Sequence, residues 1–249
     1  MDRLVYTALS GLRSQTSAQA TIANNIANAS TIGYRADRVS FDRMVLQGGG
    51  GSFNARQMSA EEVNDFDRTA GSIVQTARPL DVAVTGEAWI AVQAQDGSEA
   101  YTRRGDLTVA ASGVLETGDG FPVMGSGGPI TVPPHQAIRI ADDGTITIVP
   151  PGGDANQPQV LDRIKLTSTA GTTTLKGLDN LLHVKGGGVL PDDLDAKVQA
   201  GALEQSNVNL TQALVDMIEN QRSYEVQANL LKEAKNMDES TASLMRLPS

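Results

Sequence analysis

Cysteine is absent from this chain of 249 residues, which excludes disulfide bonds and thiolate metal sites. Aromatic residues make up only 4% of the sequence, fewer than a single large hydrophobic core usually contains, whereas glycine and other small residues are abundant. We therefore expect thin sheets, tight turns and close contacts between helices. No apolar run reaches the roughly 18 residues that a membrane-spanning helix requires.

Basic residues are outnumbered by acidic ones, 20 against 29, which gives a net charge of −9. A protein that binds a nucleic-acid duplex normally carries a basic patch, and none stands out. The two histidines, His135 and His183, lie in no catalytic or metal-binding motif. We therefore predict a protein that is not an enzyme and that has no catalytic residues, metal, cofactor, nucleic-acid partner or small-molecule substrate.

The tripeptide Ala27-Asn28-Ala29 resembles the cleavage site of a signal peptide. The residues before it are too polar to form the apolar core that such a peptide needs. We therefore expect no cleaved signal, and a chain that leaves the cytoplasm would use another route.

Charge is also missing locally, because residues 14–34 contain no charged side chain. In this stretch, "ATIANNIANASTIGY" places apolar residues at helical spacing with asparagines between them. Asparagine is a mediocre helix former, but amides can bond across packed helices where a charge would be costly. The pattern predicts a helix surrounded by protein on several sides. We expect Asn24, Asn25 and Asn28 to form hydrogen bonds between helices. We expect Gly33 to let the chain leave the helix.

At both ends of the chain, seam residues recur at alternating intervals of four and three positions, which predicts heptad-like helices. In the first, the residues expected to bury against the C-terminal helix or its neighbours are Leu9, Leu12, Ile22 and Ile26. In the second, residues 207–246, the predicted seam contains Leu210, Leu214, Met217, Tyr224 and Leu231. Asn207 or Asn209 is expected to cap it. Because packing stabilises such helices more than propensity does, we predict assembly with other subunits.

The middle of the chain, residues 80–190, is predicted to be β, since short alternating runs are separated by Asp-Gly and Ser-Gly turns. The clearest hairpin is "AIRIADDGTITIV" (137–149). Its carboxylates are interpreted as turn residues rather than metal ligands.

The predicted fold class is α+β, in which two long terminal helices pair as a coiled-coil-like rod domain and flank a central antiparallel all-β domain. An irregular or extended connector with a glycine-rich loop at 47–53 is expected before the β domain. The predicted divisions are an N-terminal helix at 1–34, the connector at 35–79, the β domain at 80–190, a return connector at 191–206 and a C-terminal helix at 207–249.

Three segments together resemble the flagellar rod and hook family of bacteria. "ANNIANASTIGYRA" (23–36) is similar to the family's N-terminal rod signature. The stretch that begins "RPLDVAVTGEAWIAVQ" (78–93) and continues to residue 125 resembles the β segment of its longer members. "LEQSNVNLTQALVDMIENQRSYEVQANLLKEA" (203–234) is similar to its C-terminal signature. The order of the three segments, and the position of two of them at the chain ends, make the joint match specific.

The resemblance implies a structural subunit that polymerises through its terminal helices into a hollow shaft, which transmits torque and encloses the export channel. The implied partners are copies of itself, inner-rod and distal-rod proteins, and the flagellar export apparatus. The implied location is the basal body, where the rod lies in the periplasmic space. Export through the flagellar type III system, without a cleaved signal, is also implied.

Within the family, "MDRLVYTALSGL" (1–12) is similar to the start of the proximal-rod members, and the length also fits distal-rod members, which are the alternative. An alternative from another class is an adhesin-like binding module. Such a module would expose clustered aromatic side chains on its β segment, where the aromatic residues are Trp89, Tyr101 and Phe121.

Overall fold

The computed structural model describes residues 2–45, 57–154 and 157–245, and the chain forms two units. The helical unit comprises Met1–Ala27, Asp37–Asp65 and Asn209–Ser249, and the β unit comprises Asn28–Ala36 and Phe66–Val208. The chain therefore passes between the units after residues 27, 36, 65 and 208. Two helices at the chain ends and a mostly β centre confirm the α+β class.

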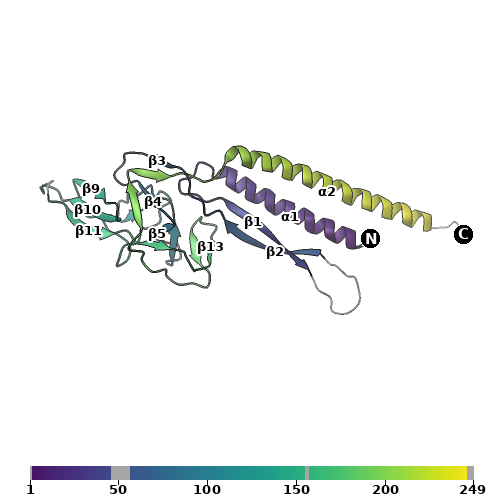
Figure 1. Ribbon diagram of the computed structural model, residues 1–249, viewed down its shortest axis with the longest axis horizontal. Coiled ribbons are helices and arrows are strands. Elements are labelled where there is room, and N and C mark those ends of the chain that lie inside the picture. The colour runs from purple at the N-terminus through teal and green to yellow at the C-terminus, as the bar shows by residue number, and fades with distance from the viewer. Residues whose placement is uncertain (1, 46–56, 155–156, 246–249) are drawn as a thin grey trace. The chain divides into compact units, whose positions relative to one another are not determined.

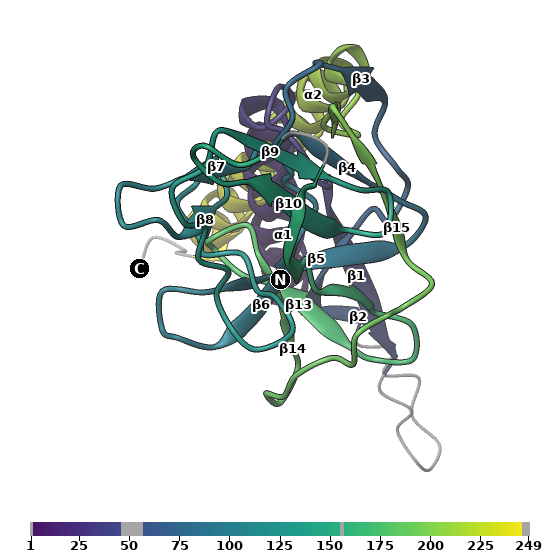
Figure 2. The ribbon, with the colours of Figure 1, turned by 90° about the vertical axis from the view of Figure 1, so that its left-hand side faces the viewer.

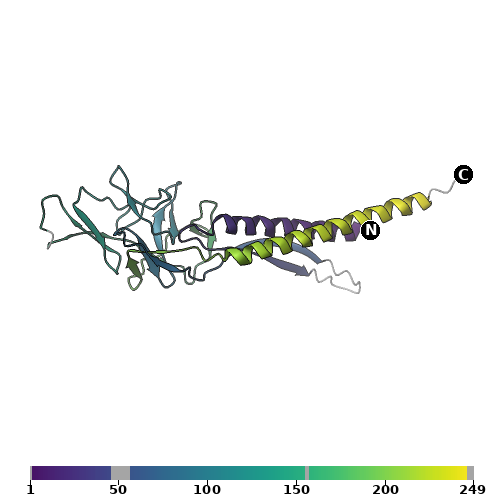
Figure 3. The same cartoon turned by 90° about the horizontal axis from the view of Figure 1, so that it is seen from above.

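The helical unit is built on α1 (Asp2–Ala27) and α2 (Leu210–Met245), which run side by side (Figures 1 and 3). Their direction is antiparallel, since Gln15 meets Asn220 and Gly11 meets Gln227. A β-carbon on Gly11 would lie 2.9 Å from the amide of Gln227, so the glycine leaves room for this contact. Strands β1 (Asp37–Val45) and β2 (Gln57–Phe66) pair with each other, and β1 contacts α1.

The first helix ends earlier than the predicted boundary at residue 34. Its last residue is Ala27, and a turn follows in which the Thr31 amide donates to the Asn28 carbonyl at 3.1 Å. Gly33 has a positive φ of 68°, a conformation that a residue with a side chain rarely adopts. Residues 28–36 consequently belong to the β unit.

The β unit contains fourteen short strands within the described residues, and Figure 2 looks onto them. They are β3 (Ile73–Gln75), β4 (Val82–Thr85), β5 (Ala88–Gln93), β6 (Glu99–Thr102), β7 (Thr108–Val109), β8 (Leu115–Glu116), β9 (Ala137–Ile140), β10 (Thr145–Val149), β11 (Gln159–Arg163), β12 (Leu166–Ser168), β13 (Thr174–Lys176), β14 (Leu182–Val184), β15 (Lys197–Ala200) and β16 (Ala202–Glu204).

These strands form small antiparallel sheets. The largest has five strands in the order β12-β5-β6-β14-β13, and a three-stranded sheet has the order β11-β10-β9. The remaining pairs are β15-β4, β16-β3 and β7-β8. The hairpin predicted at 137–149 is confirmed as β9 and β10, with the Thr145 amide bonded to the Asp143 carboxylate in the turn.

Among the described residues the core forms two clusters, and β5 contributes side chains to both. Ile90 and Val92 belong to the larger cluster, whereas Trp89 packs in the smaller one with Phe66 and Tyr101. Residues 82–84 do not follow the alternation expected of strands in this region, because Val82, Ala83 and Val84 are all buried. A strand covered on both faces reads as a continuous apolar run rather than an alternating one.

Both expected connectors contain regular strands. The segment 35–79 holds β1, β2 and β3, and the segment 191–206 holds β15 and β16, which pair with β4 and β3. The glycine-rich loop predicted at 47–53 lies outside the described residues. In the part of the chain that the structure describes, neither helix has the length and apolarity needed to cross a bilayer.

Candidate functional site

Large apolar side chains remain exposed on α2 beside its contact with α1. Their exposed fractions lie between 40 and 62%, and the residues are Leu210, Leu214, Val215, Ile218, Tyr224, Val226, Leu230 and Met237. At about 3.6 residues per turn, Leu210, Leu214 and Ile218 fall on one side of the helix. Val226, Leu230 and Met237 fall on another. The helix is therefore apolar on two surfaces that α1 does not cover.

The α1–α2 contact uses a different register from the predicted seam. Along α2 the half-buried positions include Met217 and Leu231 of the predicted seam, together with Asn220 and Gln227. Leu210, Leu214 and Tyr224 are exposed instead. Along α1, Leu12, Ile22 and Ile26 are half-buried, and Leu9 is 42% exposed.

The asparagines of α1 contact β1, which the sequence analysis did not predict. The Asn25 side chain accepts a hydrogen bond from the Asp37 amide (2.8 Å) and donates one to the Asp37 carbonyl (2.9 Å). Asn24 donates to the Asp37 carboxylate at 2.9 Å. Asn28 lies in the turn after α1, where its side-chain oxygen accepts from the Thr31 hydroxyl. A hydrogen bond between side-chain amides does join the two helices, donated by Asn220 to Gln15 at 2.8 Å.

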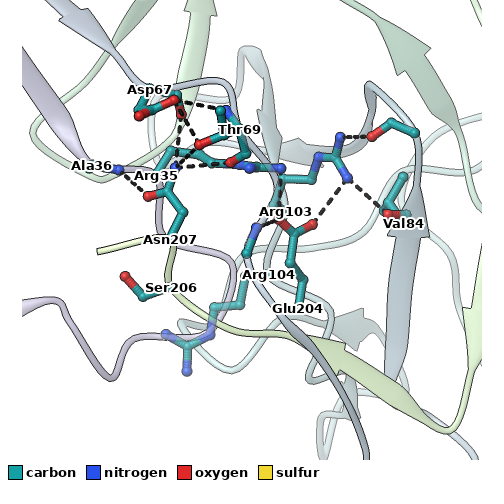
Figure 4. Close-up of polar contacts among 12 residues, drawn as sticks. Arg35, Ala36, Asp67, Thr69, Val84, Arg103, Arg104, Glu204, Ser206 and Asn207 are labelled. Atoms are coloured by element: carbon teal, nitrogen blue, oxygen red, sulfur yellow. Dashed lines mark hydrogen bonds and ion pairs between the residues drawn. The ribbon is translucent and has the colours of Figure 1, made fainter. Parts of the chain in front are cut away.

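The two asparagines before α2 have different roles. Asn209 is the N-cap, because its side-chain oxygen accepts from the Gln212 amide at 3.1 Å, two residues inside the helix start at Leu210. Asn207 lies in the β unit and caps no helix. Figure 4 shows its side chain among Ala36, Asp67 and Thr69.

Asn207 holds three separate segments together. Its side-chain oxygen accepts from the Ala36 amide at 2.7 Å, and its side-chain nitrogen donates to the carbonyls of Asp67 (3.2 Å) and Thr69 (2.9 Å). Its own amide donates to the Tyr34 carbonyl. Each of the three segments leads directly to a point where the chain passes to the helical unit. We call these contacts the Asn207 clamp.

A buried ion cluster lies beside the clamp in the same unit (Figure 4). The Glu204 carboxylate is only 2% exposed, and it pairs with Arg35 Nη2 at 2.7 Å and with Arg103 Nη1 at 3.1 Å. Its Oε1 also accepts from the Gly71 amide at 2.9 Å. Arg103 donates further to the carbonyls of Val84 and Gly86. The cluster therefore joins the segment after α1, the end of β6 and the end of β16.

Burial dominates the electrostatics of this cluster. Desolvation lowers the pKa of Arg103 to about 10, because the attraction of Glu204 only partly offsets desolvation and the neighbouring Arg35 adds repulsion. Desolvation likewise lowers the pKa of Arg35, against the attraction of Glu204 and Asp67. Both guanidinium carbons lie near the Trp89 ring, 5.9 Å (Arg35) and 5.2 Å (Arg103) from its centroid, within range of a cation–π interaction.

Arg35, Arg103 and Glu204 were not among the site residues predicted from the sequence. Arg35 and Glu204 lie inside the two terminal signature segments, at 23–36 and 203–234. Their place in these segments was the sequence feature that could have marked them as site residues. The backbone at Gly33 lies close to the backbone at Arg103. A β-carbon on Gly33 would lie 2.4 Å from the Arg103 carbonyl carbon. Among the described residues no group of three or more His, Asp or Glu could hold a metal ion.

Comparison with known proteins assigns three parts of the chain to related family models. Residues 5–35 match the flagella basal body rod protein model, residues 83–148 match the D1 domain of flagellar hook protein FlgE/F/G, and residues 199–244 match the C-terminal model of flagellar basal body rod FlgEFG protein. Both ends of the chain and the central β segment therefore have counterparts in flagellar rod and hook proteins.

Relatives that align along nearly the full chain carry corresponding names. The flagellar basal-body rod protein FlgF of Salmonella typhimurium is 38% identical over 237 residues, which cover 93% of each chain, and FlgF of Escherichia coli gives the same values. FlgG of Bacillus subtilis is 29% identical over 270 residues, covering 99% of this chain and 100% of its own.

Proposed function

This chain belongs to the family of flagellar basal-body rod proteins and is a structural subunit of the rod; we propose that its place is the proximal rod. The observation that carries this proposal is its identity to two FlgF proteins, which exceeds its identity to FlgG of B. subtilis along a similar share of the chain. The distal rod is the second candidate, because that FlgG protein aligns along its whole length.

The surface of the helical unit supports polymerisation through the terminal helices. A helix that is apolar on several sides needs more neighbours than one paired helix provides, and α2 exposes two apolar surfaces besides its α1 contact. We propose that α1 and α2 form a coiled-coil-like pair whose remaining apolar surfaces bury against other subunits. The predicted packing residues Leu9, Leu210, Leu214 and Tyr224, which are exposed in one chain, would become buried there.

The end of α2 extends beyond α1 and supports the same proposal. With Gln15 level with Asn220 and Gly11 level with Gln227 in antiparallel helices, Asp2 lies level with roughly residues 233–236, because both helices rise equally per residue. Met237 lies close to this level and is 54% exposed. Another subunit would cover this end in the assembled shaft.

The proposed partners are copies of this chain, inner-rod and distal-rod proteins, and the export apparatus during secretion. The basal body is the location, and we propose that the rod here spans the periplasm and that export leaves the N-terminus uncleaved. Mass spectrometry of the protein from purified basal bodies tests the last point. A mature chain starting after Ala29 would lack α1 and would refute it.

The deciding experiment is electron microscopy of basal bodies from a strain that lacks the gene. Basal bodies that end near the membrane ring, with no rod beyond the first segment, are expected for a proximal subunit. A rod that grows but stops before the hook would favour the distal rod. Intact hooks and filaments would refute a rod role altogether.

A matched pair of variants tests whether the helix surface drives assembly. Leu230 in α2 and Leu194 in the β unit are similarly exposed, at 62 and 71%. Leu230→Ser is expected to leave the thermal unfolding of the isolated chain unchanged and to abolish swimming. Leu194→Ser is the control and is expected to swim. Equal swimming of both variants would show that this surface of α2 is not buried in the rod.

The adhesin-like alternative has no support among the residues on which it depends. Trp89, Tyr101 and Phe121 are all buried, with exposed fractions of 6, 0 and 8%. They belong to the core and offer no aromatic surface to a ligand.

A further inference from the structure

The β unit is completed by a segment that comes late in the chain. Residues 197–207, which we call the closing segment, contain β15 and β16, and these strands pair with β4 and β3. Each of these two sheets has only two strands among the described residues. The closing segment therefore supplies the strand partners of β3 and β4, and β4 carries Val82, Ala83 and Val84 of the core.

Side chains of the closing segment also fill the interior of the unit. Val198, Ala202 and Leu203 are buried, and Val198 belongs to the larger core cluster. The Val198 amide donates to the carbonyl of Asp142 in the β9–β10 turn at 2.9 Å. Without the closing segment, the earlier strands would lose apolar contacts whose burial stabilises them.

Glu204 in the closing segment provides the carboxylate that pairs with two buried guanidinium groups, Arg35 and Arg103. Desolvation lowers the pKa of both arginines, and the attraction of Glu204 offsets this lowering more than the other nearby carboxylates, Asp67 and Glu87, do. A buried charge that lacks its pairing partner is strongly destabilising. A β unit that folded before Glu204 was in place would therefore bury two cations without the carboxylate that pairs with them.

The earliest part of the β unit, residues 28–36, docks on the closing segment as well. The Gly33 amide donates to the Glu204 carbonyl at 2.8 Å. The Ala36 amide donates to the side chain of Asn207, which lies 171 residues further along the chain (Figure 4). Contacts of this kind close a long loop, so the entropy of loop closure is lost before they can form. Residues 28–36 consequently obtain these partners only when the closing segment is present.

We propose that the closing segment controls the folding of the β unit, so that the unit with residues 197–207 detached is no more stable than the unfolded chain. A polypeptide is synthesised from its N-terminus, so the unit then stays unfolded until residue 207 of 249 has been made. Export through a narrow channel needs an unfolded chain. That consequence rests on the proposed function, whereas the folding claim itself does not.

Native-state hydrogen exchange of the full-length chain tests the proposal directly. Amides in a part that opens by itself exchange with a lower opening free energy than amides that require unfolding of the whole unit. The amides to compare are those of Val198 and Gln205 in the closing segment and that of Ala91 in β5, which donates to the Lys165 carbonyl at 2.9 Å. We expect one opening free energy for all of them. Opening of Val198 and Gln205 about tenfold or more often than Ala91 would show that the rest of the unit is stable without them, and would overturn the proposal.

A matched pair of leucine variants extends this measurement. Leu203 in β16 is 6% exposed, whereas Leu178, in the turn between β13 and β14, is 108% exposed. Leu203→Ala is expected to speed exchange at Ala91 by about 30-fold or more, and equally at Val198, because both amides open only when the unit unfolds. Leu178→Ala is the control and should change neither. Faster exchange at Val198 alone in Leu203→Ala would show that the closing segment detaches by itself, against the proposal.

Cleavage of the full-length chain tests the same claim without a substitution in the core. Residues 186–188 are exposed glycines between β14 and β15, and a β-carbon on any of them would meet no atom within 4 Å, so a protease site can be inserted there. The cleaved chain is expected to keep the fluorescence of Trp89, its only tryptophan. After denaturation and separation, the larger fragment should lack the native emission and regain it when the smaller fragment, which carries the closing segment, is added. Recovery by the larger fragment alone would overturn the proposal, and neither result depends on whether the chain acts in the rod.

Discussion

Replacing Glu204 with glutamine removes the carboxylate that pairs with both Arg35 and Arg103 while keeping the size of the side chain. The glutamine oxygen can still accept from Arg35 and from the Gly71 amide, which now bond to Oε1. Its amide nitrogen would then face Arg103 Nη1, which lies 3.1 Å from Oε2 in the native chain. Two donors would meet at hydrogen-bond distance, and two guanidinium groups would lose their shared counter-charge.

The expected loss of stability is large because the whole group is buried. Breaking a buried ion pair by removing one partner typically costs about 3–5 kcal/mol. For a chain of this size each kcal/mol lowers the melting temperature by about 2–4 °C, so we expect a decrease of about 6–20 °C in Glu204→Gln. Asp195→Asn, at an exposed loop position, is the control and should melt like the native chain.

Trp89 fluorescence is the appropriate assay, because this single tryptophan lies in the β unit beside both arginines. A second variant tests the charge argument itself. Glu204→Gln combined with Arg35→Gln leaves only one buried guanidinium, so the double variant should be less destabilised than the sum of the two single variants. A Glu204→Gln transition within about 1 kcal/mol of the native one would refute the reasoning, as would simple additivity in the double variant.

Three further predictions concern the clamp and two titrating groups. Asn207→Ala should cost about 2–4 kcal/mol in urea unfolding, because three backbone groups lose their partners, whereas loss of the cap in Asn209→Ala should cost about 1 kcal/mol; equal costs would contradict the clamp. Hydrogen bonds from the backbone and hydroxyl of Thr145 hold the pKa of Asp143 below its ordinary value of 3.8. The stability that these bonds contribute is therefore present above pH 3.8 and is lost as the pH falls through the lower pKa of the folded chain. Thr145→Val should raise the pKa of Asp143 in an NMR titration, and an unchanged pKa would refute the assignment. Burial is the main cause that raises the pKa of Tyr101 from 10.0 to about 12, so ultraviolet difference absorbance should show a late step that Tyr101→Phe removes, and stability should fall between these two values as the unfolded chain releases its proton first.

Local signals in the sequence were sufficient for the regular elements. Turn chemistry around Asp143 and Gly144 located the β9–β10 hairpin, and helical spacing located α1 and α2. The cap was left open between Asn207 and Asn209, and Asn209 fills it. These features depend on contacts between residues that are near in sequence.

Contacts between distant residues could not be predicted in the same way. Glu204 is 101 residues from Arg103, and no local pattern distinguishes a buried arginine from an exposed one. The register of the α1–α2 contact was missed for a related reason. The predicted seam included Leu210, Leu214 and Tyr224, which are exposed in one chain. The contact between the two helices includes Gly11 and the amides of Gln15, Asn220 and Gln227.

The asparagines make contacts at chain junctions that a prediction based on helix packing and capping did not include. An amide side chain donates and accepts at once, whereas a carboxylate only accepts and an ammonium only donates. Asn25 uses both functions on the amide and carbonyl of Asp37. Asn207 uses both on the Ala36 amide and on the carbonyls of Asp67 and Thr69. Both sites lie where chain segments leave regular structure and present unpaired backbone groups of both kinds, which must be satisfied when they are buried. An amide that donates and accepts at once suits a contact between helices and a contact at a chain junction equally well. Only the fold shows which of these two contacts a given asparagine makes.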